Sequence, residues 1–216
     1  MKISQIFHQV WLGSSPRHPK FIEWQGAWAK MHPGWIMQLW TQDGEDVVCG
    51  EERVVSKHPD LLAKACHLSQ RSNIWRYELI EQFGGVYLDC DMEPIKNIEP
   101  LIKDEAAFAG KLTTWLDGKL QTLVSTSIFG AQAGHPWLEE LVARMPERDP
   151  AKRSSLGNPY LTMITVEHPE VALFESDVFY PKVKFGPVNA VEVPATTYAV
   201  HHSSGRWYPG SYQSIT

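Results

Sequence analysis

The segment from Ser72 to Asp91 constrains the fold of this chain more than any other part of its sequence. It begins with a polar cap and a run of helical spacing, stops at Gly84-Gly85, and continues as an apolar run that ends in Asp89 and Asp91. Because glycine commonly ends a helix in the left-handed conformation, this pattern predicts a helix, a tight turn and a short strand. Residues two apart on a strand share a face, so we expect the two carboxylates to lie together, with Cα atoms roughly 6–7 Å apart.

The two aspartates predict a metal site. Like charges held this close repel each other, and one carboxylate would tend to stay protonated without a partner. A hard divalent cation such as Mg²⁺ or Mn²⁺ removes that conflict, because such cations prefer oxygen ligands. A cation bound there would in turn hold a diphosphate.

The composition excludes several other classes of protein. We expect a single domain over residues 1–216, since a chain of this length buries a sizeable core. The formal net charge of −5 argues against a nucleic-acid partner. The sequence contains no run of roughly 20 apolar residues and no signal-peptide core, so we expect a protein without a membrane span, in contact with a membrane only at its periphery. The three cysteines are too few and scattered for a disulfide framework or a zinc site, which favours a reducing, cytoplasmic location.

Strands and helices alternate along the chain. We expect strands at residues 3–12, 35–40, 86–89, 106–110, 127–131, 171–180 and 198–202, helices at 21–31, 60–66, 72–83, 137–145 and 159–166, and an irregular or short helical segment at 43–53. This alternation predicts an α/β sandwich with a mostly parallel sheet. Ligands of such sheets bind beyond the carboxyl ends of the strands, where Asp89 and Asp91 would lie.

Arg76 falls within the apolar stripe of the helix that precedes the aspartates. The stripe consists of Leu68, Trp75, Leu79, Ile80 and Phe83. An inward-facing arginine needs a partner, because an unpaired buried cation is very costly. The guanidinium either reaches a phosphate or ribose of a ligand, or forms a structural ion pair, and the sequence leaves both alternatives open.

Taken together, these residues resemble a known family. The runs 72–76, 84–87 and 89–91 are similar to the glycosyltransferases that carry a DXD motif in a GT-A fold, which is related to the Rossmann fold. The resemblance is to glycosyltransferase family 32 in particular, which includes initiating mannosyltransferases and bacterial capsular or lipopolysaccharide sugar transferases. Further similar segments are residues 6–13, 129–136 and 198–202 with Trp207, so the resemblance touches most of the chain.

The resemblance implies a site for a nucleotide-linked sugar. The residues implied to bind this donor are Trp11 against the nucleobase, Asn73 and Arg76 at the ribose and sugar, Tyr87 and Asp89 in the nucleotide pocket, and Trp207 over the diphosphate. Many relatives have an aspartate at the position of Asn73, and relatives often place an asparagine in the region of Thr126-Ser127. These departures leave the identity of the donor sugar open.

The resemblance also implies a metal site of Asp89, Asp91 and His201, with Asp89, Asp91 and Arg76 as the catalytic residues. An imidazole among oxygen ligands modestly favours Mn²⁺ over Mg²⁺. His202 adjoins His201, and on a strand the two side chains point to opposite faces, so the sequence alone leaves open which of them binds the metal.

The expected function is therefore that of a metal-dependent, retaining glycosyltransferase. It would move a hexose from a UDP- or GDP-linked donor to a hydroxyl of a glycan or lipid-linked glycan, in surface polysaccharide synthesis. No carboxylate is identified as a covalent nucleophile, and Cys90 is expected to face the core as a small hydrophobe.

Two other classes of protein stay open. The nine tryptophans would also suit a non-catalytic carbohydrate-binding module. A phosphohydrolase of the haloacid-dehalogenase type also has Asp-x-Asp after a strand, but this chain has Glu93 where that class usually has Thr or Val.

Overall fold

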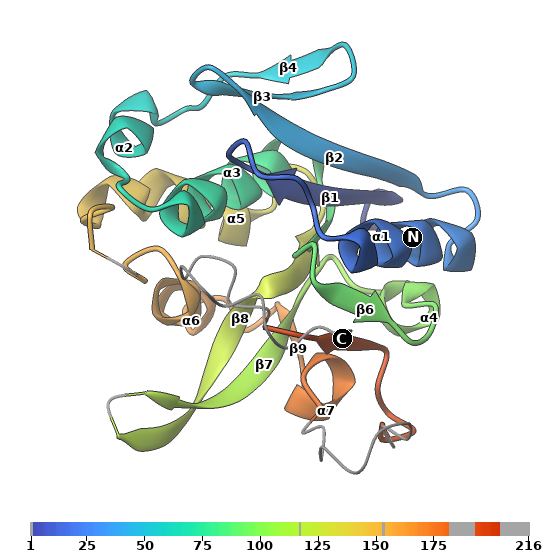
Figure 1. Cartoon of the computed structure of the whole chain (residues 1–216). Coiled ribbons are helices and arrows are strands. Elements are labelled where there is room, and N and C mark those ends of the chain that lie inside the picture. The colour runs from blue at the N-terminus through green and yellow to red at the C-terminus, as the bar shows by residue number, and fades with distance from the viewer. Residues whose placement is uncertain (1, 117, 153, 182–192, 204–216) are drawn as a thin grey trace.

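The fold is built on an eight-stranded sheet with the strand order β4-β3-β2-β1-β5-β8-β7-β9 (Figure 1). The computed structural model describes residues 2–116, 118–152, 154–181 and 193–203. The strands of this sheet are β1 (Ile6–Trp11), β2 (Ile36–Asp43), β3 (Asp46–Cys49), β4 (Glu52–Val54), β5 (Gly85–Leu88), β7 (Ala107–Leu116), β8 (Lys119–Ala131) and β9 (Ala172–Phe174). A second, two-stranded sheet pairs β6 (Met92–Pro94) with β10 (Ala199–His201).

The strands of the large sheet run mostly in one direction. β1 is parallel to both β2 and β5, and β9 is parallel to β7. The other neighbouring pairs are antiparallel, so that within the described residues six of the eight strands point the same way and only β3 and β8 run against them. The parallel centre β2-β1-β5 therefore ends at one edge, which is where a ligand is expected.

Helices cover both faces of the sheet. They are α1 (Pro19–Met31), α2 (Pro59–Lys64), α3 (Leu68–Phe83), α4 (Glu99–Ile102), α5 (Pro136–Arg144), α6 (Asn158–Thr165) and α7 (Ser176–Phe179). α3 and α6 contact the strands on one face, with α5 packed against both helices, while α1 and α7 lie on the other face beside the β6–β10 ribbon. Adjacent residues of β5 enter opposite cores, because Tyr87 packs in the α3 core whereas Val86 and Leu88 pack in the α1 core. The predicted α/β sandwich is thus observed.

Two local expectations were wrong, and two expected strands are longer than predicted. Residues 43–53 form the hairpins that link β2, β3 and β4, because Gly44 and Gly50 adopt positive φ in their two-residue loops. The strand expected over 171–180 is divided into β9 and α7, because the pattern of a short apolar run does not tell a strand from a helix. The strands expected at 106–110 and 127–131 are the bases of a much longer hairpin formed by β7 and β8.

α3 is more deeply buried than its apolar stripe predicts. Every residue from Ser72 to Ile80 is buried, including Arg76 and Glu78, because the sheet and α5 both pack against the helix. Leu68, which was expected in the stripe, is 39% exposed at the first turn instead. Polar side chains on all sides of α3 therefore need partners inside the protein.

The turn after α3 requires both of its glycines. Gly84 and Gly85 have φ of 64° and 95°. A Cβ on Gly84 would lie 2.6 Å from the backbone N of Ala133, and one on Gly85 would lie 2.6 Å from the backbone O of Ile6. No other residue fits this close approach, so the glycines fix where β5 begins relative to α3.

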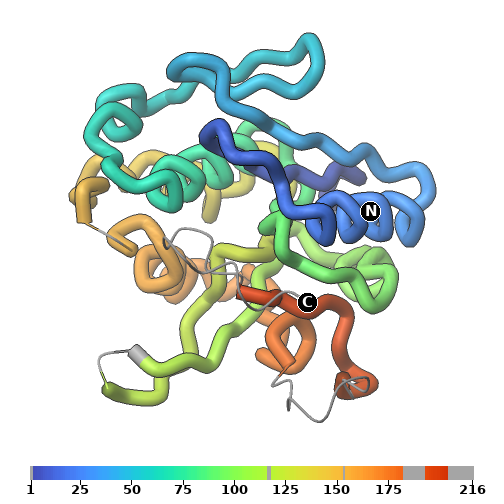
Figure 2. The backbone as a smooth tube through the Cα atoms, in the orientation of Figure 1, coloured from blue at the N-terminus to red at the C-terminus, as the bar shows by residue number. Residues whose placement is uncertain are grey.

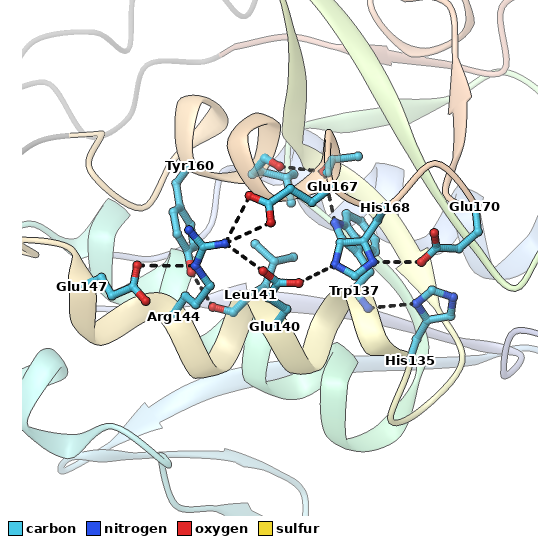
Figure 3. Close-up of polar contacts among 12 residues, drawn as sticks. His135, Trp137, Glu140, Leu141, Arg144, Glu147, Tyr160, Glu167, His168 and Glu170 are labelled. Atoms are coloured by element: carbon cyan, nitrogen blue, oxygen red, sulfur yellow. Dashed lines mark hydrogen bonds and ion pairs between the residues drawn. The ribbon is translucent and has the colours of Figure 1, made fainter.

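A polar network ties α5 to the segment after α6 (Figure 3). Glu140 accepts from Arg144 Nη1 at 2.7 Å and is bonded to His168 Nε2 at 2.8 Å. Glu170 is bonded to the other ring nitrogen of His168 at 2.9 Å. The histidine therefore links two carboxylates, one on α5 and one in the segment after α6.

Glu78 is a buried carboxylate that contacts the loop before α2. Its Oε1 accepts a hydrogen bond from Ser56 Oγ at 2.9 Å. Burial raises the pKa of Glu78 to about 7, although the bond from Ser56 favours the ionised form. The folded protein thus keeps a proton on Glu78 at pH values where the unfolded chain has lost it, because the ordinary pKa of this carboxyl is 4.5.

This proton makes the stability of the protein depend on pH. As the pH rises from 5 to 7, the unfolded chain has lost the proton while the folded protein keeps it, so the free energy of unfolding should fall. Glu78→Gln should flatten this decline and be more stable than the wild type at pH 8 by up to about 3 kcal/mol, measured by urea denaturation. Ser56→Ala should steepen the fall in the free energy of unfolding, because loss of the Ser56 hydrogen bond raises the pKa of Glu78 further. A wild-type slope in Glu78→Gln would contradict the assignment.

Candidate active site

The two aspartates lie in the turn that follows β5. β5 ends at Leu88, and the backbone N–H of Asp89 donates to Ser127 O of β8 at 2.8 Å. Met92 N donates to Asp89 O at 3.1 Å and closes the turn around Asp91. The expectation that both aspartates extend the strand was therefore wrong, but the turn still places their side chains together.

His201 joins the aspartates from the far end of the described chain. β10 is antiparallel to β6, with His201 opposite Met92, so the red end of the chain lies beside the green segment that follows the aspartates (Figure 2). His201 Nε2 is 3.1 Å from Asp91 Oδ1 and 3.7 Å from Asp89 Oδ2. One ligand atom from each of the three residues lies within 4.8 Å of the others. All three residues expected at the metal are thus gathered in one partly buried cluster.

The two neighbouring histidines have different surroundings. His202 Nε2 is 2.8 Å from Glu93 Oε2, and its ring stacks on Trp24. The geometry therefore brings His201, and not His202, to the two aspartates.

Arg76 is held by bonds inside the protein. Its side chain is only 5% exposed. Nη1 donates to Thr126 O at 2.7 Å, while Nε and Nη2 donate to Ser72 O and Oγ at 3.3 and 3.0 Å. Nη2 also pairs with Asp89 Oδ1 at 3.2 Å. Of the two alternatives for this arginine, the structure shows the ion pair.

Tyr87 contacts the same oxygen of Asp89, Oδ1, as Arg76 does. Its hydroxyl donates to Asp89 Oδ1 at 2.8 Å, and its buried ring lies 4.4 Å below the Arg76 guanidinium. Asp89 is therefore fixed through Oδ1 by two neighbours, while Oδ2 faces His201. Such second contacts orient a metal ligand.

Most of the expected donor-binding residues are described. Trp11 is half-buried at the carboxyl end of β1, where it packs against the cluster of Phe21, Trp24 and Cys90, and its Nε1 donates to Ser15 O at 3.0 Å. Asn73 is 6% exposed, and its Nδ2 lies near Gly157 at the start of α6. Trp207 lies outside the described residues. Their roles in binding a donor stay predictions.

An asparagine reaches the Thr126 region from α6. Asn158 Oδ1 accepts bonds from both N and Oγ1 of Thr126 at 3.0 Å. Sequence reasoning missed Asn158, because 32 residues separate the partners and only its position at the start of a helix marked it. Cys90, by contrast, faces Phe21 and Trp24 in the core, as predicted.

The cluster suits a hard or borderline divalent cation. Two carboxylates and an imidazole match the ligands of Mn²⁺, and Mg²⁺ would bind through the carboxylates. Although burial lowers the pKa of His201, the charge of Asp91 and then of Asp89 raise it above its ordinary value overall. The two carboxylates thus favour the protonated form of this imidazole.

Fold and site together define an α/β protein with a cluster of two aspartates and a histidine at the carboxyl edge of its sheet. Residues 19–108 match the family described as "Glycosyltransferase sugar-binding region containing DXD motif". These findings confirm the expected class: the chain is related to the DXD-containing glycosyltransferases, which are enzymes, and its fold is of the GT-A type.

Three similar proteins illustrate this relationship. Inositol phosphoceramide mannosyltransferase 3 of Schizosaccharomyces pombe is 25% identical over 97% of this chain, and the chain spans 55% of that relative's length. The structure of PaToxG glycosyltransferase has a TM-score of 0.54 at 14% identity, covering 77% of this chain and 70% of that one. A glycosyltransferase involved in the glycosylation of the major capsid of PBCV-1 has a TM-score of 0.50 at 13% identity, covering 92% of each chain. The two structures show likeness of fold.

The contacts of Arg76 predict a large loss of stability on its removal. Arg76→Met should lower the free energy of unfolding by about 3–5 kcal/mol in urea denaturation, because Asp89 and the Thr126 carbonyl lose their buried partner. Arg53→Met is the matched control, since Arg53 pairs with Asp43 and Asp46 at the surface, and its effect should be far smaller. Equal losses in the two variants would contradict a buried, structural role.

Proposed function

We propose that this protein is a metal-dependent, retaining glycosyltransferase that moves a hexose from a UDP- or GDP-linked donor to an acceptor hydroxyl. The observation that carries the proposal is the convergence of Asp89, Asp91 and His201 from two distant segments. Mannose is the first hexose to test, because a relative is named as a mannosyltransferase.

The chemistry of the leaving group supports this function. Breaking the anomeric bond of a nucleotide sugar develops negative charge on the diphosphate, and a bound cation supplies positive charge for it. Asp91 and His201 would hold the cation, and Asp89 would be kept in place by Arg76 and Tyr87. The helical and sheet layers around these residues bury them in part, which strengthens their interaction with a charged ligand.

The proposal includes retention of the anomeric configuration of the transferred sugar. Retention would follow if the acceptor hydroxyl attacks from the face that the diphosphate leaves, with the leaving phosphate taking the proton. This same-face route needs no protein nucleophile, and no carboxylate is assigned that role here.

The acceptor and the location complete the proposal. We assign the acceptor to the class of glycans or lipid-linked glycans and the reaction to surface polysaccharide synthesis, on the cytoplasmic side of a membrane. Among the helices that the structure describes, none combines the length and apolar character needed to cross a bilayer.

Asp91→Asn should abolish metal-dependent turnover and leave the fold intact. Release of nucleoside diphosphate from a panel of UDP- and GDP-linked glucose, galactose, N-acetylglucosamine and mannose should fall at least about 100-fold, since the cation loses a charged ligand. Asp46→Asn is the control, because Asp46 pairs with Arg53 on a strand remote from β5.

Two results would contradict the proposal. One is wild-type turnover by Asp91→Asn, or wild-type turnover in the presence of a chelator. The other is calorimetric binding of glycan with no effect of Mn²⁺ or sugar nucleotide, which would identify a carbohydrate-binding module instead.

A further inference from the structure

His201 is carried by a weak piece of secondary structure. β10 and β6 have three residues each, and their pairing ends with His201 opposite Met92. An isolated two-stranded ribbon is at best marginally stable, and Pro94 has no N–H to contribute to this one. The position of the imidazole therefore depends on contacts other than the backbone pairing of these two strands.

His202 supplies three such contacts. Its backbone N–H donates to Asp91 O at 3.1 Å. Its ring nitrogen Nε2 lies 2.8 Å from Glu93 Oε2. The same ring stacks on Trp24, with centroids 4.4 Å apart and planes inclined by 13°. One residue thus connects the end of β10 to the turn of the aspartates, to β6 and to α1.

The aromatic partner of His202 is itself held in place. Trp24 is 6% exposed in α1. One helical turn later, Trp28 Nε1 donates to Met92 O of β6 at 2.9 Å. α1 therefore holds both strands of the ribbon, β6 through Trp28 and the end of β10 through Trp24.

This arrangement determines where His201 points. Consecutive side chains of an extended chain project to opposite sides, so an imidazole of His202 held against α1 directs that of His201 toward the carboxylates. Directly after His202 the chain turns at Ser203, whose φ is +45°, and Ser203 Oγ lies 3.2 Å from His201 Nδ1. A contact at Nδ1 leaves Nε2 as the nitrogen for a metal.

We propose that His202, held by Glu93 and Trp24, is a positioning residue that fixes His201 as a ligand of the divalent cation. The inference rests on the proposed function, because it concerns the same metal site. It gives His202 a role distinct from ligation: the side chain acts through its neighbour and does not contact the cation.

The test measures the affinity of the protein for Mn²⁺ alone, by isothermal titration calorimetry and by the electron paramagnetic resonance of free Mn²⁺. His202→Ala should weaken binding about 10-fold, the lower range for loss of a residue that orients a ligand. Glu93→Ala should weaken it in the same direction. Glu93→Gln should stay near the wild type, because its amide oxygen still accepts from the His202 ring.

A matched control lies in the network of Figure 3. His168 contacts Glu140 at 2.8 Å, the same distance as between His202 and Glu93. His168 precedes β9, at the amino end of a strand that runs in the same direction as β5, whereas the aspartates follow the carboxyl end of β5. His168→Ala should therefore bind Mn²⁺ like the wild type. Circular dichroism and thermal unfolding establish whether each variant is folded. If His202→Ala does not fold, the Mn²⁺ affinity of Glu93→Ala decides the test.

Three outcomes would overturn the inference: wild-type Mn²⁺ affinity in a folded His202→Ala or Glu93→Ala, equal weakening in Glu93→Gln and Glu93→Ala, or equal weakening in His168→Ala. Equal weakening in the two Glu93 variants would identify Glu93 as a ligand itself.

Asp91→Asn separates failure of the positioning role from failure of the proposed function. If Asp91→Asn loses Mn²⁺ binding while His202→Ala keeps it, only the positioning role fails. If Asp91→Asn binds Mn²⁺ like the wild type, the metal site itself is wrong.

Discussion

The buried ion pair between Arg76 and Asp89 is the interaction on which the site depends. It joins α3 to the turn after β5, and the same guanidinium reaches β8 through the carbonyl of Thr126. A cation in this position is tolerable only because every side of it is occupied by a carboxylate, backbone or hydroxyl oxygens, and the face of Tyr87. The packing of α3 therefore also determines the position of Asp89.

The site is otherwise assembled from segments that are distant in sequence. The aspartates follow a central strand, whereas His201 arrives on a short ribbon that depends on α1 for support. The two halves meet because the β6 strand begins directly after the aspartate turn and pairs with β10. A displacement of α1 would consequently shift His201 through the contacts of Trp24 and Trp28 with the ribbon, although α1 contributes no residue to the cluster.

The sequence predicted the parts of this molecule that are set by local physics. Gly84-Gly85 and the apolar run after them located the turn and β5, and the joint pattern of the motif identified the class. The sequence did not predict that the aspartates lie in a turn, since that depends on Ser127 and Met92 as backbone partners. Likewise, the burial of every residue from Ser72 to Ile80 depends on packing of the sheet and α5 against α3, and the bond between Asn158 and Thr126 joins residues 32 apart in sequence.

The division of contacts among the carboxylate oxygens explains how a highly charged site is stable before a cation arrives. Asp89 uses Oδ1 for Tyr87 and Arg76, so that oxygen is already neutralised by the protein, and only Oδ2 faces His201. Asp91 Oδ1 lies 3.1 Å from His201 Nε2, and the two carboxylates raise the pKa of that imidazole. In the proposed function a cation would be held by Asp89, Asp91 and His201, while the contacts of Asp89 Oδ1 keep that carboxylate in place. The cost of organising the ligands is thus met by folding, which is how a preformed site gains affinity.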